Sequence, residues 1–178
     1  MACGYSTITT ALESCGGQRA TKGIKDLKWV ANFGAITSTL TNNKATLITG
    51  VAFDFTGYKD NANVGSDATI SDIPTGFKHF FQFKDNNKTA AVRLMLDKAD
   101  NISVIVEANG SKTEGCFLMY GQKNGLWKKT QSQKANDDNG QTNLEFETRE
   151  GMEEDYSAIV VWNTDYATTL SMLNGLSV

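Results

Sequence analysis

Alternating apolar and polar residues recur in short stretches along the chain, and turns rich in Gly and Asn separate these stretches. In residues 24–33 the alternation places Leu27, Trp29, Ala31 and Phe33 on one side. A β-strand points successive side chains to opposite faces, so this spacing is typical of a strand with one buried face. By the same pattern, or by a short apolar run, we predict further strands at residues 45–55, 77–84, 102–108, 116–121, 126–133, 141–149 and 158–162.

Two of the predicted strands carry several large apolar side chains. The strand at 45–55 alternates as one element, and the residues that share a face are Leu47, Thr49, Val51, Phe53 and Phe55. In the strand at 77–84 one face is mainly aromatic, with Phe77, His79, Phe81 and Phe83, while Phe80 lies on the other face. Such an aromatic face is able to stack on bases or sugars, but it is more often part of a core. We therefore predict that this face is buried.

Helical spacing is confined to a few segments. An apolar stripe predicts a helix over residues 88–100, capped within residues 85–87, and its members are Ala91, Val92, Met95, Leu96 and Ala99. Thr164 is expected to cap a helix that runs to Asn174 and stops at Gly175, and a short helix is expected at residues 6–14.

These elements predict a mainly β fold, a β-sandwich or small barrel with one flanking helix and short terminal helices. The length of 178 residues fits one domain. Within it we expect an N-terminal arm at 1–20, a C-terminal extension at 158–178, and a long loop at 57–76, which is polar and contains the single proline, Pro74.

The charge of the chain excludes some classes of function. Its formal net charge is −3 and charged residues make up 21% of it, so it lacks the basic excess that neutralises nucleic-acid phosphates. No apolar run approaches the roughly 20 residues of a membrane helix. Residues 1–14 have no basic residue before a weak apolar patch, so we expect neither a signal peptide nor an anchor.

The stretch KANDDNGQTNLEFETREG, residues 134–151, has the strongest appearance of a metal or catalytic loop. If Gly140 stood at position six of a calcium-binding EF-hand loop, Ala135 and Phe146 would stand at positions one and twelve, where oxygen ligands are required. The run Asn136 to Gly140 is instead typical of a turn, and Asn139-Gly140 is a common hairpin pair. We predict a hairpin whose second strand is 141–149.

Other candidates for chemistry are few. Cys3, Cys15 and Cys116 lack metal-ligand spacing, so a zinc site with His79, the only histidine, is disfavoured, and their odd number favours a reducing compartment. The acidic run at 150–155 holds a carboxylate pair, Glu150 and Glu153, that would serve glycoside hydrolysis only across a cleft. The chain has no known hydrolase, phosphate-loop or dinucleotide motif. We therefore expect no catalytic, metal or cofactor site.

Two alternatives stay open beside a structural role. A carbohydrate-binding or adhesion module would present exposed Trp29, Trp127 or Trp162 as a stacking platform, whereas a non-binding domain would bury them. A hydrolase would need the 150–155 carboxylates in a pocket.

The order of the pieces resembles a layout found in virion proteins of tailed bacteriophages that infect gut bacteria. In that layout a Gly followed by Ile-Lys opens the first strand, here Gly23, Ile24 and Lys25. A G…NGL hairpin follows the central strands, and an Asp-Asn-Gly turn starts a late strand that ends near a Glu. The matching positions are Gly121, Asn124, Gly125 and Leu126 for the hairpin, and Asp138, Asn139, Gly140 and Glu150 for the turn and strand.

This resemblance covers residues 15–151 and implies a tail-tube-like fold in a ring-forming subunit of the tail, tail hub or head-to-tail connector. Its implied partners are copies of itself and neighbouring tail, connector or portal proteins, with DNA as a non-specific passenger. It implies a virion location after assembly in the host cytoplasm. The segments 57–76 and 158–178 depart from the layout.

Overall fold

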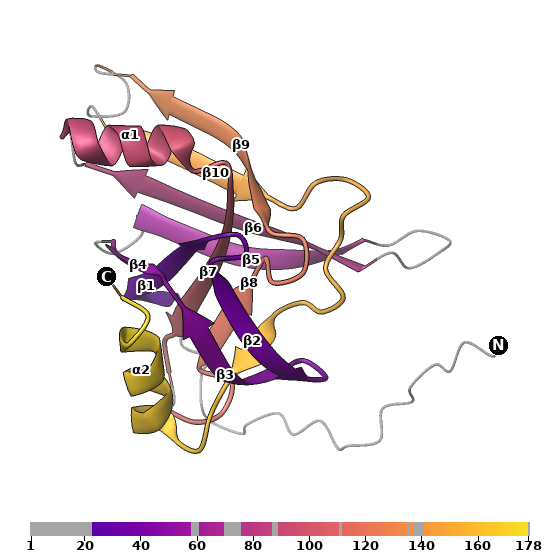
Figure 1. The fold of residues 1–178 in the computed structure, drawn as a ribbon. Helices are drawn as coiled ribbons and strands as arrows, with labels where there is room; N and C mark the ends of the chain where they lie inside the picture. Colours follow the sequence, from indigo (N-terminus) through magenta and orange to yellow (C-terminus); the bar gives the residue numbers. More distant parts are fainter. Residues whose placement is uncertain are drawn as a thin grey trace.

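The computed structural model describes residues 23–57, 61–69, 76–86, 89–110, 112–134, 136 and 141–177. Over these residues the fold is mainly β, with strands joined in one 11-stranded sheet and two helices packed against it (Figure 1). The elements are β1 (Ile24–Asn32), β2 (Ile36–Thr41), β3 (Lys44–Gly50), β4 (Phe53–Thr56), β5 (Ala62–Thr69), β6 (Gly76–Asp85), α1 (Ala90–Lys98), β7 (Asn101–Ala108), β8 (Phe117–Tyr120), β9 (Leu126–Gln133), β10 (Thr142–Glu147), β11 (Ile159–Val161) and α2 (Tyr166–Asn174).

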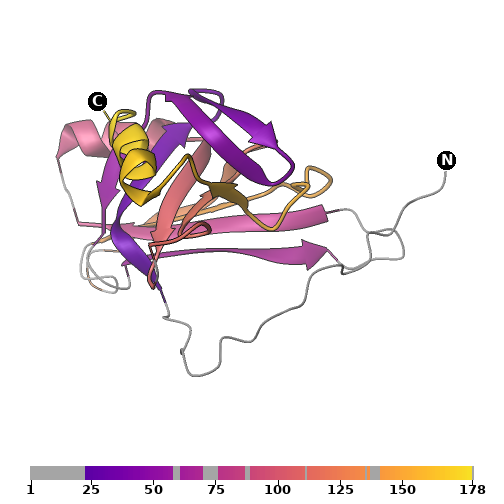
Figure 2. The same ribbon diagram turned by 90° about the horizontal axis from the view of Figure 1, so that it is seen from below.

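The sheet branches at β7. One edge of β7 pairs with β1, which in turn carries β4. The opposite edge pairs with β8 through residues 104–107 and with β9 through Asn101 and Ile102. From there one branch runs β8-β11-β3-β2 and the other runs β9-β10-β6-β5, and β11-β3 is a parallel pair. Figure 2 shows β5 and β6 on the opposite side of the central strands from β2 and β3.

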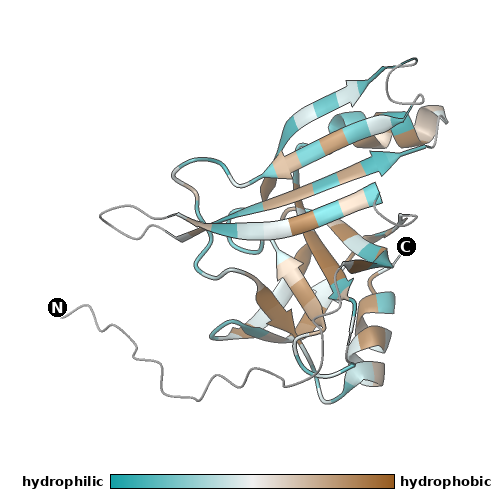
Figure 3. Ribbon diagram, turned by 180° about the vertical axis from the view of Figure 1, so that it is seen from behind, coloured by the Kyte–Doolittle hydropathy of each residue, from teal (hydrophilic) through white to brown (hydrophobic). Residues whose placement is uncertain are grey.

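The central strand separates two hydrophobic clusters. Every residue from Ile102 to Glu107 is buried, because β7 is covered on both faces. Ile105 belongs to the cluster under α2, with Trp29, whereas Val104 and Val106 belong to the cluster under α1. Figure 3 shows hydrophobic colour concentrated on the central strands, while strands of the β9–β5 branch alternate along their length.

Most predicted strands are confirmed with small shifts of their ends. The aromatic face of β6 is confirmed as core, since His79, Phe81 and Phe83 are buried, although Phe77 is only partly buried. β9 and β10 form the predicted antiparallel hairpin. Of the predicted turn between them only Asn136 lies within the described residues, and residues 137–140 lie outside them, as does the helix predicted at 6–14.

Two predictions for the first half of the chain were wrong. The stretch 45–55 is two strands, because β3 ends at Gly50, whose φ is 125°, and β4 begins at Phe53. Its supposed common face is not buried, since Leu47, Val51 and Phe53 are among the exposed apolar side chains. β2 was not predicted, because its sequence ITSTLT has no run of large apolar residues.

The predicted loop at 57–76 contains β5, whose residues Ala62 to Thr69 pair with β6 along their whole length. Backbone hydrogen bonding holds this strand rather than a large apolar face. Ala62 and Val64 pack partly buried against the cluster under α1. At Gly65 the ring of Phe80 lies so close that a Cβ would stand 2.7 Å from the ring. Residues 58–60 and 70–75 lie outside the described part of the chain.

Both described helices begin at caps other than those predicted. α1 starts after Thr89, whose hydroxyl accepts the Val92 N–H at 3.5 Å, so the cap lies beyond the predicted range 85–87. α2 starts after Asp165, whose carboxylate accepts the Thr168 N–H at 2.8 Å, and it ends at Gly175 as predicted. Neither described helix is long and apolar enough to cross a membrane.

The C-terminal segment is integral to the fold rather than an appended extension. β11 lies between β8 and β3 and joins them into one sheet. On α2, Leu173 is completely buried in the cluster that also holds Trp29. Residues 158–177 therefore contribute to the core of the β2–β8 branch.

Candidate functional site

The turn from β8 to β9, residues 121–125, forms the corner at which the sheet branches. It contains the GQKNG stretch whose glycines and Asn124 match the phage-like layout. Gly121 and Gly125 have φ values of 68° and 77°, a region that favours glycine. A Cβ on Gly125 would stand 2.0 Å from Oδ1 of Asn101, so this position also leaves no room for a side chain.

Glu154, which forms a β-bridge with Phe77 of β6, fixes this corner through its side chain. Its carboxylate accepts the backbone N–H of Lys123 at 2.9 Å and that of Asn124 at 2.9 Å. The Asn124 side chain in return donates to the carbonyls of Met152 and Glu153 at 3.0 and 3.1 Å. Glu154 is only 4% exposed, so these backbone donors, rather than water, supply the hydrogen bonds of its carboxylate.

His79 completes the corner on its inner side. Its Nδ1 accepts the Gly121 N–H at 3.1 Å, so the ring hydrogen sits on Nε2, which donates to the Tyr156 carbonyl at 2.8 Å. Burial lowers the pKa of His79 below its ordinary value, although the Tyr156 carbonyl and the nearby Glu154 carboxylate act in the opposite direction. The imidazole is therefore neutral, and each of its nitrogens forms a hydrogen bond with the backbone.

The corner network holds the two branches together and leaves no reactive group free. Ser103 donates its hydroxyl to the Gly121 carbonyl at 2.7 Å, which ties the turn to β7. Both nitrogens of His79 and both oxygens of Glu154 are occupied by backbone partners. A general acid or base needs a proton site that substrate is able to reach, so this geometry is structural.

The predicted carboxylate pair does not form a cleft. Glu150 is exposed, and Glu153 accepts the Gly151 N–H at 3.2 Å within its own turn. The two grooves described below are lined by other residues. Glu154, which the sequence interpretation did not single out, is the buried member of the acidic run, and only its burial and its backbone donors in three dimensions distinguish it.

The described part of the chain contains no group of three or more His, Cys, Asp or Glu side chains able to hold a metal ion. Cys116 is buried in the cluster under α2, and burial raises the pKa of its thiol. Since both nitrogens of His79 face backbone groups, His79 and Cys116 do not meet as ligands. Cys3 and Cys15 lie outside the described residues.

None of the tryptophans is exposed as a stacking platform. Trp29 is buried and meets Phe117 edge to face at 6.1 Å. Trp127 is partly buried, and the guanidinium of Arg149 covers its ring at 3.6 Å. Trp162 packs partly buried against the cluster under α2. The structure therefore does not present the aromatic surface expected for a carbohydrate-binding module that uses these residues.

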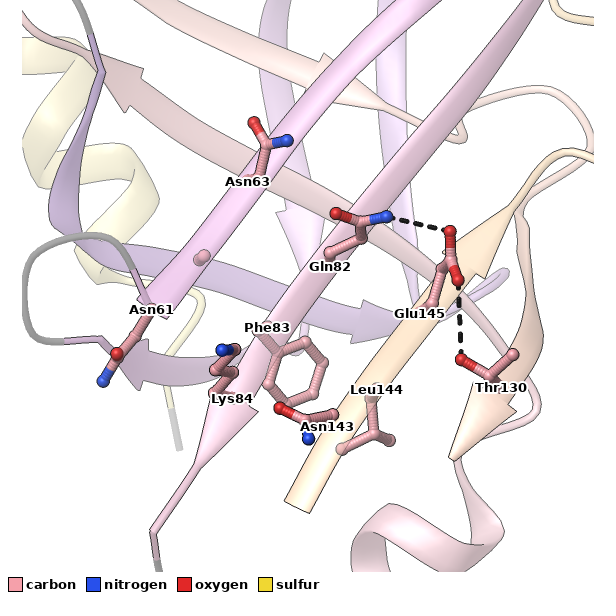
Figure 4. Close-up of a pocket in the computed structure, with 10 residues that line it drawn as sticks. Asn61, Asn63, Gln82, Phe83, Lys84, Thr130, Asn143, Leu144 and Glu145 are labelled. Carbon is pink, nitrogen blue, oxygen red and sulfur yellow. Dashed lines mark hydrogen bonds between the residues drawn. The ribbon is translucent and has the colours of Figure 1, made fainter. Parts of the chain in front are cut away.

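A polar groove of about 280 Å³ crosses the outer face of β5, β6, β10 and β9 (Figure 4). The Gln82 amide donates to Glu145 at 2.8 Å, and Thr130 donates to the same carboxylate at 3.5 Å. Asn63 and Asn143 add further amide groups to the lining. Gln82, Glu145 and Thr130 satisfy one another, whereas the buried Oδ1 of Asn143 has no hydrogen-bond partner among the described residues.

The two ends of the nine-strand path are open edges. Within the described residues β5 pairs only with β6, and β2 pairs only with β3. β5 has the sequence ANVGSDAT with one charged residue, Asp67, and β2 has the sequence ITSTLT with none. Soluble proteins usually protect such edges with Lys, Pro, a bulge or a short strand. No other strand of the described residues pairs with the outer side of either strand, and the pairing of β2 with β3 has one register shift, between Thr39 and Leu40.

An apolar groove of about 300 Å³ lies between α1 and the β1–β4 pair. Its apolar lining includes Phe53, Phe55, Met95, Leu96, Ile102 and Phe146. The charged residues in its lining are Asp54 and Lys98. Sequence reasoning missed this groove because it assigned Phe53 and Met95 to buried stripes.

Comparison with known proteins identifies no relative of this chain. No family model, no curated protein and no solved structure matches the chain.

Proposed function

We propose that the chain is a non-enzymatic structural subunit of a bacteriophage virion. Copies of it assemble into a ring in the tail, tail hub or head-to-tail connector, and DNA passes through the ring. The observation that carries this proposal is the pair of strand edges, β5 and β2, at opposite ends of one sheet path, whose outer sides no other described strand covers. The resemblance of the strand and turn order to phage virion proteins supplies the biological setting.

Two different open edges on one molecule favour head-to-tail association. If β5 of one copy lies beside β2 of the next, each interface joins two unlike surfaces, and repeated rotation closes a ring. Pairing of backbone groups across the interface satisfies both edges at once. In this arrangement the subunit is a tail-tube-like β-sandwich or small barrel with α1 on its flank.

The electrostatics of the chain suit a conduit for DNA. A formal net charge of −3 provides little attraction for phosphates, so a duplex would pass without being held. Neighbouring virion proteins are the other partners, and no membrane contact is part of the proposal. Location in the virion follows from the proposed role, after assembly in the host cytoplasm.

The test is electron microscopy of purified protein and of virions, combined with substitutions in the two edges. Asn63→Lys with Ala68→Lys places two charges at exposed positions of β5, and Thr39→Lys places one at an exposed position of β2. Both variants are expected to fold and to lose closed rings of six or twelve copies. Ala91→Lys, at an exposed position of α1, is the matched control and should keep the rings. Monomers alone in purified protein and in virions would refute the proposal.

A carbohydrate-binding role is the second candidate, and the amide-rich polar groove is the observation that favours it. The amides of Asn63, Gln82 and Asn143 have the donors and acceptors that sugar hydroxyls require. A glycan array distinguishes the two roles, because a ring subunit should bind no glycan. Binding that is lost in Gln82→Ala, with rings unaffected, would favour the second role.

A further inference from the structure

The apolar groove between α1 and the β1–β4 pair has bulky side chains that the described fold leaves uncovered. Phe53 and Met95 both line it, and they are 44% and 46% exposed. Single exposed apolar residues are ordinary, but their grouping around one groove marks a surface that another segment covers.

We propose that residues 5–12 of the same chain occupy this groove. Residues 1–12 have the sequence MACGYSTITTAL, which contains no Asp, Glu, Lys or Arg. Tyr5, Ile8 and Leu12 have the spacing that puts three side chains on one side of a helix. An uncharged segment with a narrow apolar stripe matches a narrow groove whose only charged lining residues are Asp54 and Lys98.

The length of chain before β1 agrees with this assignment. β1 begins at Ile24, and the groove is lined by Val30, Ala31 and Asn32 at the opposite end of that strand. A strand of nine residues spans about 30 Å. The linker at residues 13–22, when extended, spans roughly 33 to 36 Å at about 3.3 to 3.6 Å per residue. The linker is therefore long enough to span the distance from the start of β1 to the groove.

The linker also has the composition that a connection of this kind requires. It contains Gly16 and Gly17, and its charged residues Glu13, Arg19 and Lys22 lie outside the proposed docked segment. Glycine pairs give the chain freedom to turn back along β1. Docking within one chain does not depend on ring formation. A negative result for the docking therefore leaves the proposed function untouched, and the reverse also holds.

The experiment compares thiol labelling at two neighbouring positions of α1 in the full chain. Leu94 and Met95 are both exposed, at 54% and 46%, but only Met95 lines the groove. Each is changed singly to Cys in a chain that carries Cys3→Ser and Cys15→Ser, while the buried Cys116 is left in place. A maleimide dye should label position 95 about tenfold more slowly than position 94, as for a segment docked about nine-tenths of the time.

Paired charge substitutions test the identity of the occupant. Ile8→Asp with Leu12→Asp should raise labelling at position 95 to the rate at position 94. Thr7→Asp with Thr10→Asp adds the same charge on the opposite side of the helical wheel and should keep the protection. Equal labelling of 94 and 95 in the parent, or protection that survives the Ile8 and Leu12 changes, would overturn the proposal. Protection that fades on dilution would overturn it too, because a second copy would then be the source.

Discussion

The hydrogen bonds that His79 makes to the corner also determine the protonation state of its ring. Protonation would place a second hydrogen on Nδ1, directly opposite the Gly121 N–H that Nδ1 now accepts. The folded state therefore resists protonation, and burial lowers the pKa of His79. The unfolded chain has no such restraint and takes up a proton near pH 6.5.

We predict that acid weakens the fold through this residue. Because the pKa is lower in the folded state, the stabilisation is fully present above about pH 6.5 and is lost as the pH falls toward the folded pKa. The free energy of unfolding should fall by up to about 1.4 kcal/mol per pH unit more in the parent than in His79→Gln. Denaturant unfolding of both proteins between about pH 5 and 8 measures the difference.

No other histidine occurs in the chain, so the difference between the two proteins reports His79 alone. Gln has an amide oxygen to accept from Gly121 and an amide nitrogen to donate to Tyr156, but it does not titrate. Parallel curves of unfolding free energy against pH would show that His79 is not the titrating group.

Gly125 tests the steric requirement of the same corner. Gly115 and Gly125 have φ values of 97° and 77°, but a Cβ on Gly115 would meet nothing within 4 Å, whereas one on Gly125 would meet Asn101. Gly115→Ala should cost about 1 kcal/mol through backbone strain alone. Gly125→Ala should cost about 2 to 4 kcal/mol, because the clash adds to the strain. Urea unfolding of both variants checks the ranking, and equal losses would mean that Asn101 moves aside freely.

At the scale of elements, the sequence revealed those that bury apolar side chains and missed those that do not. β7, β10 and the aromatic face of β6 have regular apolar spacing, and all three were located. β2 and β5 lie at edges, where half of the backbone and much of the side-chain surface faces outward. Their positions are set by pairing with β3 and β6, which single-sequence periodicity does not report.

The errors at helix ends have a similar origin. Thr164 and Asp165 are both capping residues, and the choice between them depends on which oxygen reaches the N–H of Thr168. The stripe predicted on α1 is confirmed only in part, because Leu96 is buried and Val92 and Ala99 are partly buried, whereas Ala91 and Met95 are exposed. The depth to which each side chain packs depends on the neighbouring strands, which helical spacing does not report.

The candidate site was predicted only in its turn residues. Gly121, Asn124 and Gly125 were singled out in sequence, and they do form the corner of the sheet. Glu154 and His79 join them from distant positions, through a bridge that pairs Phe77 with Glu154. The contact of Glu154 and His79 with this turn depends on tertiary packing, so residue spacing along the chain does not predict it.

At the scale of the whole molecule, β7 couples the two halves of the fold. It supplies Ile105 to the cluster under α2 and Val104 and Val106 to the cluster under α1. Neither cluster is complete without this strand, and both branches hydrogen-bond to the same edge of it. The two halves are therefore expected to unfold together rather than as separate units.

Single-tryptophan variants test this coupling. Trp29 lies in the cluster under α2, and Trp127 lies on β9 opposite Asn101 in the other branch. Replacing the remaining tryptophans by Phe should give urea curves with one common midpoint for the two reporters.

Ile105→Ala removes atoms from the first cluster only and should cost about 2 to 5 kcal/mol. Because β7 is shared, Ile105→Ala should lower the urea midpoint reported by Trp127 as much as the midpoint reported by Trp29. If the Trp127 midpoint stayed at its value in the parent, the β9-β10-β6-β5 branch would be a separate folding unit. That branch would then be able to form its β5 edge while the other half is still unfolded.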